Sequence, residues 1–221
     1  LESPSMNEIR IDKKSFVRIC KNRDILEDYD FIKELGSGTY GIVYEAVHRT
    51  TSERRAIKAI CKEQVDDEEA LKNELTILKQ LDHPNIVKLY EIYEYGNDIY
   101  MVTELCEGGE LFHYITKKKH LTEAQAAKIM RQMFGAVAYL HANKVCHRDL
   151  KPENFLLKFK DDDSCIKLID FGLSRKLRDN EVMSEPNGTP FYIAPEILMH
   201  NTHYDSKCDV YSFGIIMHEV F

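Results

Sequence analysis

The sequence lacks the features that mark membrane-spanning, secreted or repetitive proteins. It has no run of about 18 apolar residues, so it predicts no membrane-spanning helix. Its first residues, LESPSMNEIR, contain neither the apolar core of a signal peptide nor the Met-Gly start of a myristoylation motif. Internal repeats and low-complexity tracts are absent as well. These absences favour a globular protein without a membrane segment.

Cysteine usage and charge exclude two further classes. Six cysteines are scattered singly and no CxxC pair occurs, so we expect no zinc site. Single thiols are typical of a reducing compartment, and we therefore expect a cytoplasmic protein. The net charge of −7 argues against a nucleic-acid partner and favours basic partners or none.

Length and residue pattern predict an α+β fold in two parts. The 221 residues are enough for one large domain or two small ones packed together. Residues 1–28 are polar and mixed in charge, apart from an apolar patch at 15–20, so we expect an N-terminal extension there. A mostly β half at 29–105 then precedes a mostly α half at 106–221.

The predicted elements follow from the period of the apolar residues and from turn and capping signals. The β half contains FIKELGSGTYGIVYEAVH (strand, turn, strand), RRAIKAI (strand), DDEEALKNELTILKQL (helix) and VKLYEIYEYGNDIYMVTEL (hairpin turned at Gly96-Asn97). The α half contains a helix begun by the capping box at Thr122 to Gln125, with Ile129, Met133, Val137 and Leu140 on one face, then NFLLK and CIKLIDFG as strands around the acidic turn DDDS, and the helix DVYSFGIIMHEVF.

A glycine-rich motif lies between the first two strands. The residues GSGTYG, from Gly36 to Gly41, match GxGxxG. In a dinucleotide-binding fold a helix follows this motif, whereas here the strand IVYEAV follows. The pattern predicts a hairpin whose backbone lies close over phosphate groups, because glycine has no side chain. A plain flexible turn fits the same residues, since short matches arise by chance.

Two charges of opposite sign break apolar patterns in neighbouring elements. Lys58 shares a strand face with Ala56 and Ile60, and Glu74 lies within the apolar stripe of the following helix. Charges on packed faces need partners, so we expect Lys58 and Glu74 to form an ion pair. The alternative is a lysine that reaches solvent along its own stem beside a frayed glutamate.

Charged residues also stand at the ends of two apolar runs. HRDLKPEN, residues 147–154, lies between VC and FLL, and charges at the edge of a core need partners or a chemical role. Asp170 ends a strand and precedes Phe171-Gly172, which suits a hard cation such as Mg²⁺. An ordinary Asp-x-Gly turn is the alternative.

Five motifs in the order GSGTYGIV, AIK, HRDLKPEN, DFG and APE resemble the eukaryotic protein kinases. The resemblance covers residues 29–221 and implies a bilobal fold, with a small β-rich N-lobe at 29–105 and a larger helical C-lobe at 106–221. Kinase domains usually continue past the helix beginning near Asp209, so we expect a truncated C-lobe. The implied activity is transfer of the ATP γ-phosphate to Ser or Thr hydroxyls, with ATP and Mg²⁺ as cofactors.

The resemblance also implies catalytic roles. Asp149 would accept or orient the proton of the substrate hydroxyl, and Lys151 would neutralise charge on the transferring group. Lys151 together with Thr189 is similar to the serine/threonine-specific branch. The remaining implied catalytic residues are Lys58, which would bind the α- and β-phosphates, its partner Glu74, and the metal ligands Asn154 and Asp170.

Nucleotide and peptide sites are implied in the same way. Residues 103–106, TELC, look like the hinge, with the carbonyl of Glu104 and the amide of Cys106 facing adenine and Thr103 as gatekeeper. Glu110 and Glu153 would bind an arginine of the substrate, which predicts a preference for R-x-x-S/T. The other binding residues that the resemblance implies are Leu35, Gly36, Ser37, Gly38, Gly41, Val43, Ala56, Lys58, Leu156 and Asp170. The implied regulatory spine is Leu78, Leu89, His147 and Phe171, anchored by Asp209.

The activation segment, residues 170–196, departs from the pattern of many kinases. Where a phosphorylated Thr often stands, this chain has Glu185. We therefore expect Arg148 to pair with a permanent carboxylate, so that the segment is ordered without phosphorylation. A flexible loop with an exposed glutamate is the alternative, and Ser184 remains a candidate modification site.

The motifs FIKELGSGTYG, TELCEGGELF and GTPFYIAPEIL resemble the calcium-dependent protein kinases of plants and protists, with calmodulin-dependent kinases the nearest alternative. Members of that family carry EF-hands after the kinase domain, and this chain has no EF-hand loop. Calcium regulation through a domain outside the chain is therefore implied by the family alone. The competing interpretation is an inactive or weak kinase fragment that binds nucleotide or acts as a scaffold.

Overall fold

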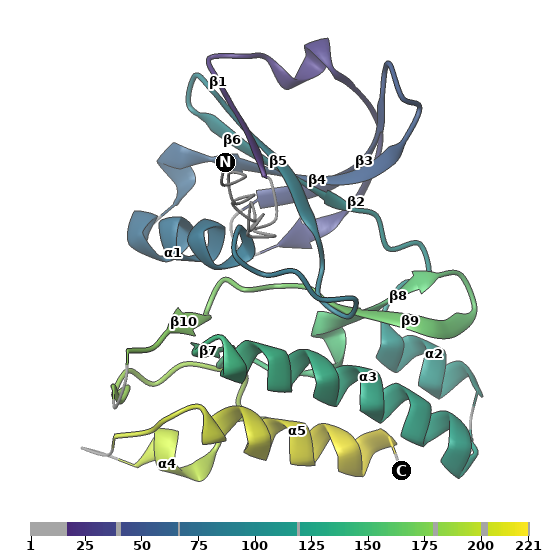
Figure 1. The fold of residues 1–221 in the computed structure, drawn as a ribbon, viewed down its shortest axis with the longest axis vertical. Coiled ribbons are helices and arrows are strands. Elements are labelled where there is room, and N and C mark those ends of the chain that lie inside the picture. Colours follow the sequence, from purple (N-terminus) through teal and green to yellow (C-terminus); the bar gives the residue numbers. More distant parts are fainter. Residues whose placement is uncertain are drawn as a thin grey trace, which may run out of the picture.

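The computed structural model describes residues 17–38, 41–65, 67–118, 120–178, 181–199 and 203–220. Two lobes are stacked in Figure 1: a twisted sheet with the helix α1 above, and a layer of helices below. A short hairpin, β8–β9, lies between them on the side of the lower lobe. No helix in the described ranges has both the length and the apolar character needed to cross a membrane.

The small lobe is built on one six-stranded sheet with the order β1-β5-β6-β4-β3-β2. Every neighbouring pair is antiparallel except β1 and β5, which run parallel. The strands and helices of this lobe are β1 (Arg18–Lys21), η1 (Ile25–Glu27), β2 (Tyr29–Gly38), β3 (Gly41–His48), β4 (Arg54–Cys61), η2 (Lys62–Gln64), α1 (Glu68–Leu78), β5 (Leu89–Tyr95) and β6 (Asp98–Glu104).

Alternation along the strands divides the apolar residues between two cores. In β4, Ile57 packs on the outer face of the sheet and Ile60 on the inner face toward α1. In β6, Val102 packs on the outer face and Met101 on the inner face. This is the period of two that the sequence predicts for strands. The inner face continues into the core of the large lobe, so one apolar cluster links both lobes.

Residues 18–28, part of the stretch that the sequence predicts as an N-terminal extension, pack against the small lobe. Strand β1 pairs with β5, and Cys20 and Ile25 are buried in the outer-face cluster of the sheet. The hydroxyl of Tyr93 on β5 also donates to Asp28 at 2.7 Å. Residues 18–28 therefore belong to the small lobe, because they cover apolar surface that the other strands leave open. The first part of the apolar patch at 15–20, residues 15–16, lies outside the described residues.

The large lobe contains the long central helix α3, which begins at the predicted capping box. The Thr122 hydroxyl accepts from the Gln125 amide, and the Gln125 side chain accepts from the Thr122 amide. The predicted apolar face of α3 is buried. The elements of this lobe are α2 (Leu111–Lys118), α3 (Glu123–Ala142), β7 (Val145–Cys146), η3 (Pro152–Asn154), β8 (Phe155–Phe159), β9 (Asp162–Leu168), β10 (Arg175–Lys176), α4 (Pro195–Leu198) and α5 (Lys207–Val220).

One predicted turn is shifted along the chain. The sequence places an acidic turn at 161–164, whereas the structure turns at Lys160 and Asp161 and begins β9 at Asp162. Asp161 takes the positive φ of 54° that the turn requires, a conformation that Asp tolerates better than most residues. The strand is therefore longer than the apolar pattern alone indicates.

Candidate active site

The segment HRDLKPEN forms a loop that is fixed at its base by Asp209 of α5. The two carboxylate oxygens of Asp209 accept the backbone amides of His147 and Arg148, both at 2.8 Å. Arg148 has a φ of 68°, which is costly for a residue with a side chain. The buried carboxylate holds this strained turn in place and so directs the next residue, Asp149, out of the core.

Asp209 is itself supported from α3. The ring of His141 contributes Nε2 at 2.8 Å from Asp209 Oδ2. Burial alone would raise the pKa of Asp209, but hydrogen bonds from His141 and from the two loop amides hold it below its usual value. The sequence identified Asp209 as an anchor only through family resemblance and gave no sign of the His141 contact, which joins residues 68 positions apart.

Asp149, Lys151 and Thr189 contact one another through their side chains. Asp149 Oδ1 accepts from the Thr189 hydroxyl at 2.7 Å, and its Oδ2 lies 2.8 Å from Lys151 Nζ. Lys151 Nζ also donates to the same hydroxyl at 3.1 Å. Partial burial would raise the pKa of Asp149, but the hydrogen bonds from Lys151 and Thr189 outweigh it and lower the pKa. The carboxylate is therefore ionised and ready to accept a hydrogen bond from an incoming hydroxyl.

The two predicted metal ligands lie at the open end of the β8–β9 hairpin, one just before β8 and the other two residues after β9. Asn154 ends η3 and donates Nδ2 to the carbonyl of Asp149 at 2.9 Å, which leaves its Oδ1 as the atom to face a cation. Asp170 follows β9 and accepts from the Gly172 amide at 3.0 Å. Backbone pairing of Ile169 with Asn154 at 2.9 Å keeps these two positions adjacent.

Lys58 and Glu74 form the predicted ion pair between β4 and α1. Lys58 Nζ lies 3.2 Å from Glu74 Oε1, and both side chains are largely shielded from solvent. Glu74 Oε2 is buried and has no hydrogen-bond partner among the described residues. Burial raises the pKa of Glu74, Lys58 opposes that rise, and the charge of Asp170 adds to it.

This charge distribution fits a divalent cation. Glu74 and Asp170 are close enough to affect one another electrostatically, and Asp170 and Asp149 both act on the ring of His147. Oxygen ligands from carboxylates and an amide are those that Mg²⁺ prefers. The residues present therefore fit the metal that the motifs imply, and Asn154 and Asp170 are the side chains that would hold it.

Aromatic packing connects this site to the core. The rings of His147 and Phe171 lie 5.3 Å apart, and both are completely buried. Burial lowers the pKa of His147, so the ring is neutral. Leu78 and Leu89, the other predicted spine residues, are buried in the same cluster as Phe171. These positions lie in the core under either a structural or a regulatory interpretation.

The glycine-rich turn closes the hairpin β2–β3, with Gly38 paired to Gly41. A Cβ atom on Gly41 would meet the carbonyl oxygen of Ala59 at 1.9 Å, so the backbone approach to β4 requires glycine. Leu35 is exposed at the edge of this turn. The tip of the motif, Thr39 and Tyr40, lies outside the described residues.

The proposed adenine contacts come from both lobes. Val43 on β3 and Ala56 on β4 are half-buried, and Leu156 on β8 is half-buried in the large lobe. Thr103, near the end of β6, donates its hydroxyl to the carbonyl of Ala56 at 3.4 Å. Burial raises the pKa of Cys106, two residues after β6, to about 12. The two carboxylates expected to bind substrate arginine, Glu110 beside α2 and Glu153 in η3, are exposed.

The activation segment is held by the acidic residue that the sequence identified. Glu185 lies 3.3 Å from Arg148 and 2.9 Å from Arg175. The expected Arg148 pair is therefore present, and Arg175 is a second partner that the sequence did not indicate. The hydroxyl of Tyr204 also donates to the Glu185 carbonyl at 2.7 Å.

Two buried thiols meet beneath the loop. Cys146 on β7 and Cys208 on α5 bring their sulfur atoms to 3.5 Å, although 62 residues separate them. Both are free thiols. The neighbouring Asp209 carboxylate is already occupied by the loop amides and His141, so the thiols serve as packing between β7 and α5.

Comparisons with known proteins agree with this geometry. A family model described as "Protein kinase domain" matches residues 29–221. The chain belongs to the protein kinase family. It is 44% identical over 98% of its length to Calcium-dependent protein kinase 5 of Plasmodium falciparum (isolate 3D7), and 40% identical over 99% to Calcium-dependent protein kinase 3 of Plasmodium yoelii yoelii. It is also 44% identical over 85% to Myosin light chain kinase A of Dictyostelium discoideum.

The matched region is only part of these relatives. The alignments cover 39% and 40% of the two calcium-dependent kinases and 64% of the myosin light chain kinase. The chain therefore spans about two fifths of the length of these calcium-dependent kinases. In kinase terms, the small lobe is the N-lobe and the large lobe is the C-lobe. Residues 103–106, which the sequence predicts as the hinge, are called the hinge below.

Proposed function

We propose that this chain carries the catalytic domain of a protein serine/threonine kinase, which transfers the γ-phosphate of ATP to a Ser or Thr hydroxyl of a protein substrate. The observation that carries the proposal is the contact set of Asp149 with Lys151 and Thr189. An ionised carboxylate here orients the substrate hydroxyl and takes its proton, and the adjacent ammonium neutralises charge on the transferring group.

Nucleotide binding follows from the residues around Asp149. Lys58, held by Glu74, would bind the α- and β-phosphates, and the glycine-rich turn would cover them. Asn154 and Asp170 would hold Mg²⁺, whose charge would neutralise that of the phosphates. The half-buried apolar side chains of Val43, Ala56 and Leu156 would enclose the adenine base.

The test is phosphate transfer from Mg-ATP to an R-x-x-S peptide by the natural full-length protein. We expect transfer by the wild type and its loss in Asp149→Asn and in Asp170→Ala. Asp149→Asn should keep a thermal shift with Mg-ATP, because Asp149 is assigned to the hydroxyl and not to the nucleotide. A wild type that binds Mg-ATP but transfers no phosphate would instead support a nucleotide-binding scaffold.

We further propose that substrates carry a basic residue three positions before the acceptor. Glu110 and Glu153 are exposed carboxylates, and the backbone of Glu110 bridges to Leu156, three residues after Glu153. A pair of carboxylates suits the guanidinium fork. A degenerate peptide library should show an Arg preference at that position. The preference should weaken in Glu110→Gln and Glu153→Gln but persist in a control, Glu123→Gln, at the start of α3. A library without basic preference in the wild type would contradict this assignment.

Regulation by calcium is proposed from the relatives. Two of those compared are named calcium-dependent protein kinases, and we propose a calcium-binding regulatory region outside these 221 residues. Activity of the full-length protein should rise when free calcium replaces a chelator. Equal activity in both conditions would refute calcium control.

We also propose a cytoplasmic location, which imaging of a tagged full-length protein would test.

A further inference from the structure

The back of the hinge contains a buried carboxylate that the sequence pattern did not explain. Glu104, the last residue of β6, is only 6% exposed. Its Oε1 lies 2.7 Å from Lys167 Nζ, and its Oε2 lies 2.8 Å from Lys158 Nζ. The backbone amide of Lys88 donates to Oε1 at 2.9 Å. One side chain of the N-lobe thus receives two ammonium groups of the C-lobe.

The same cluster also holds the main chain of the hinge. Lys158 Nζ donates to the carbonyl of Leu105 at 2.9 Å. The amide of Glu104 donates to the carbonyl of Lys88 at 3.0 Å, and the amide of Glu107 donates to the carbonyl of Lys158 at 3.1 Å. Both ends of the short hinge are therefore tied to their neighbours, and its middle carbonyl is tied to a lysine.

Electrostatics make this cluster sensitive to the loss of one member. Burial alone would raise the pKa of Glu104, but hydrogen bonds from Lys158 and Lys167 outweigh it and lower the pKa. Lys167 is itself buried. Removing one partner of a buried ion pair leaves a charge without compensation, which is costly, whereas replacing all partners by apolar groups of similar size often is not.

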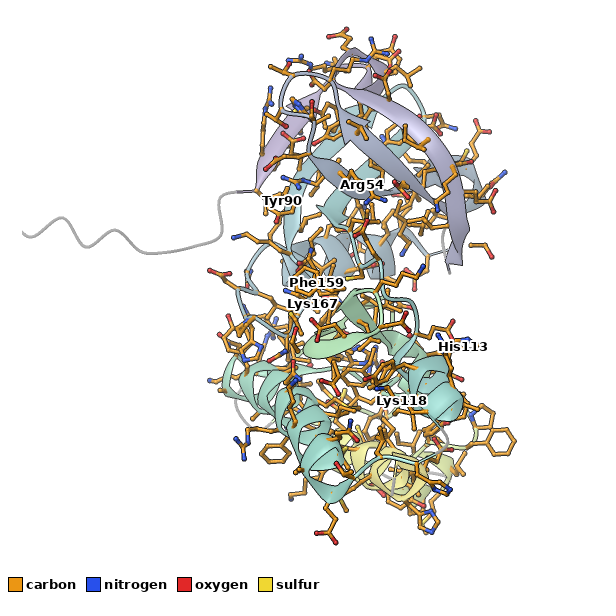
Figure 2. All side chains as sticks on the ribbon, turned by 90° about the vertical axis from the view of Figure 1, so that its right-hand side faces the viewer. Arg54, Tyr90, His113, Lys118, Phe159 and Lys167 are labelled. Carbon is orange, nitrogen blue, oxygen red and sulfur yellow. The ribbon has the colours of Figure 1, made fainter. Side chains whose placement is uncertain are left out.

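The two lysines come from the strands that carry the nucleotide and metal residues. Lys158 lies on β8, two residues after Leu156, and Lys167 lies on β9, three residues before Asp170. Lys167 is labelled in Figure 2, where it lies between the sheet of the N-lobe and the helices of the C-lobe. A single carboxylate therefore connects the hinge to both strands beneath the proposed site.

We propose that Glu104, Lys158 and Lys167 form a clamp that positions the hinge backbone for the adenine base, so that all three act as positioning residues for ATP. The inference rests on the proposed function, because it assumes that nucleotide binds at residues 104–106. In an extended segment successive carbonyls point in opposite directions. Lys158 holds the Leu105 carbonyl on the side of the hinge that faces the clamp. The Glu104 carbonyl and the Cys106 amide then point to the opposite side, where the adenine base would bind.

The first test compares the KM for ATP with the KM for peptide and with kcat, in the natural full-length protein. Glu104→Gln and Lys158→Met should each raise the KM for ATP about tenfold, the factor that corresponds to one hydrogen bond to a charged group. The KM for peptide and kcat should change less than about threefold, because uniform loss of ground-state binding alters KM alone. Lys158→Arg should recover part of the affinity. The matched control is Lys160→Met, at the exposed turn of the same hairpin, which should behave as wild type.

A second variant separates positioning from simple stabilisation. In the triple variant Glu104→Met, Lys158→Met, Lys167→Met no buried charge is left alone, so it should melt at a higher temperature than Glu104→Gln, although the Lys88 amide and the Leu105 carbonyl lose their partners. The clamp predicts that this variant still has a raised KM for ATP and a matching loss of Mg-ATP affinity in calorimetry. Wild-type ATP affinity in a folded triple variant would overturn the clamp.

The outcomes also distinguish the clamp from the function on which it rests. If the wild type binds no Mg-ATP, the proposed function itself fails. If the wild type binds Mg-ATP, and Glu104→Gln and Lys158→Met are folded yet bind it equally well, only the clamp fails. If kcat, kcat/KM for ATP and kcat/KM for peptide all fell together, and the melting temperature fell as well, the cluster would only stabilise the fold.

Discussion

Glu185 provides a direct test of how the activation segment is ordered. In the substitution Glu185→Ala, Arg148 and Arg175 lose the carboxylate that lies 3.3 Å and 2.9 Å from them. The Glu185 side chain is 57% exposed, whereas that of Arg148 is 11% exposed. The perturbation therefore removes an accessible partner from an arginine that is largely shielded and leaves it bonded to the Leu173 carbonyl at 2.6 Å.

The exposure of Glu185 limits the size of the effect. Exposed ion pairs contribute about 0–1 kcal/mol each, so we expect the free energy of unfolding to fall by about 1 kcal/mol. For a domain of this size that corresponds to a fall of about 2–4 °C in melting temperature. If catalysis requires the ordered segment, the same energy lowers the ordered fraction, and with it kcat, by up to about fivefold.

The assay is peptide phosphorylation with thermal melting on the same samples. Glu181→Ala is the matched control, because Glu181 lies 2.9 Å from Arg175 but is not the partner of Arg148. The difference between Glu185→Ala and the wild type should shrink at high salt, which screens exposed charges. The reasoning would be refuted if Ser184→Ala abolished activity while Glu185→Ala left it intact, since order would then depend on modification.

Three further predictions concern stability and catalysis. Glu74→Gln should leave the melting temperature unchanged or higher, because burial already disfavours the charged form, yet should lower phosphate transfer at least about tenfold in the peptide assay. Asp209→Asn should destabilise the protein by about 3–5 kcal/mol. The pKa of Asp209 is held below its usual 3.8, so the wild type loses stability as the pH falls through that depressed value. In denaturant titrations at a series of pH values, the free energy of unfolding of the variant should fall less at acid pH than that of the wild type. Gly108→Ala places a Cβ 2.2 Å from the Phe159 carbonyl and should lower stability in denaturant unfolding, whereas Gly214→Ala, in open space on α5, should raise it by about 0.5–1 kcal/mol.

A stability loss in Glu74→Gln equal to that of a broken buried ion pair would show that the Lys58 contact outweighs burial. If the free energy of unfolding of Asp209→Asn fell at acid pH as much as that of the wild type, another group would control acid unfolding. Equal effects of the two glycine substitutions would show that Gly108 does not lie in close contact with Phe159 of β8.

The sequence by itself determined the local structure and most of the candidate site. Period-two alternation identified the strands of the N-lobe, and the capping box fixed the start of α3, because both signals depend on neighbouring residues. The misplaced charges Lys58 and Glu74 predicted their own ion pair, which the structure confirms at 3.2 Å. The motif order indicated the family, which the comparisons confirm.

Only the tertiary structure decided which distant residues meet. Strand β1 looked like an extension, because its four residues carry little pattern until β5 offers an edge for pairing. Glu104 read only as a hinge residue, and its two lysines are 54 and 63 positions further along the chain. His141 and Asp209 likewise come together only when α3 packs beside α5. Local patterns encode elements, whereas buried charge pairs depend on the packing of elements, which no short stretch of sequence contains.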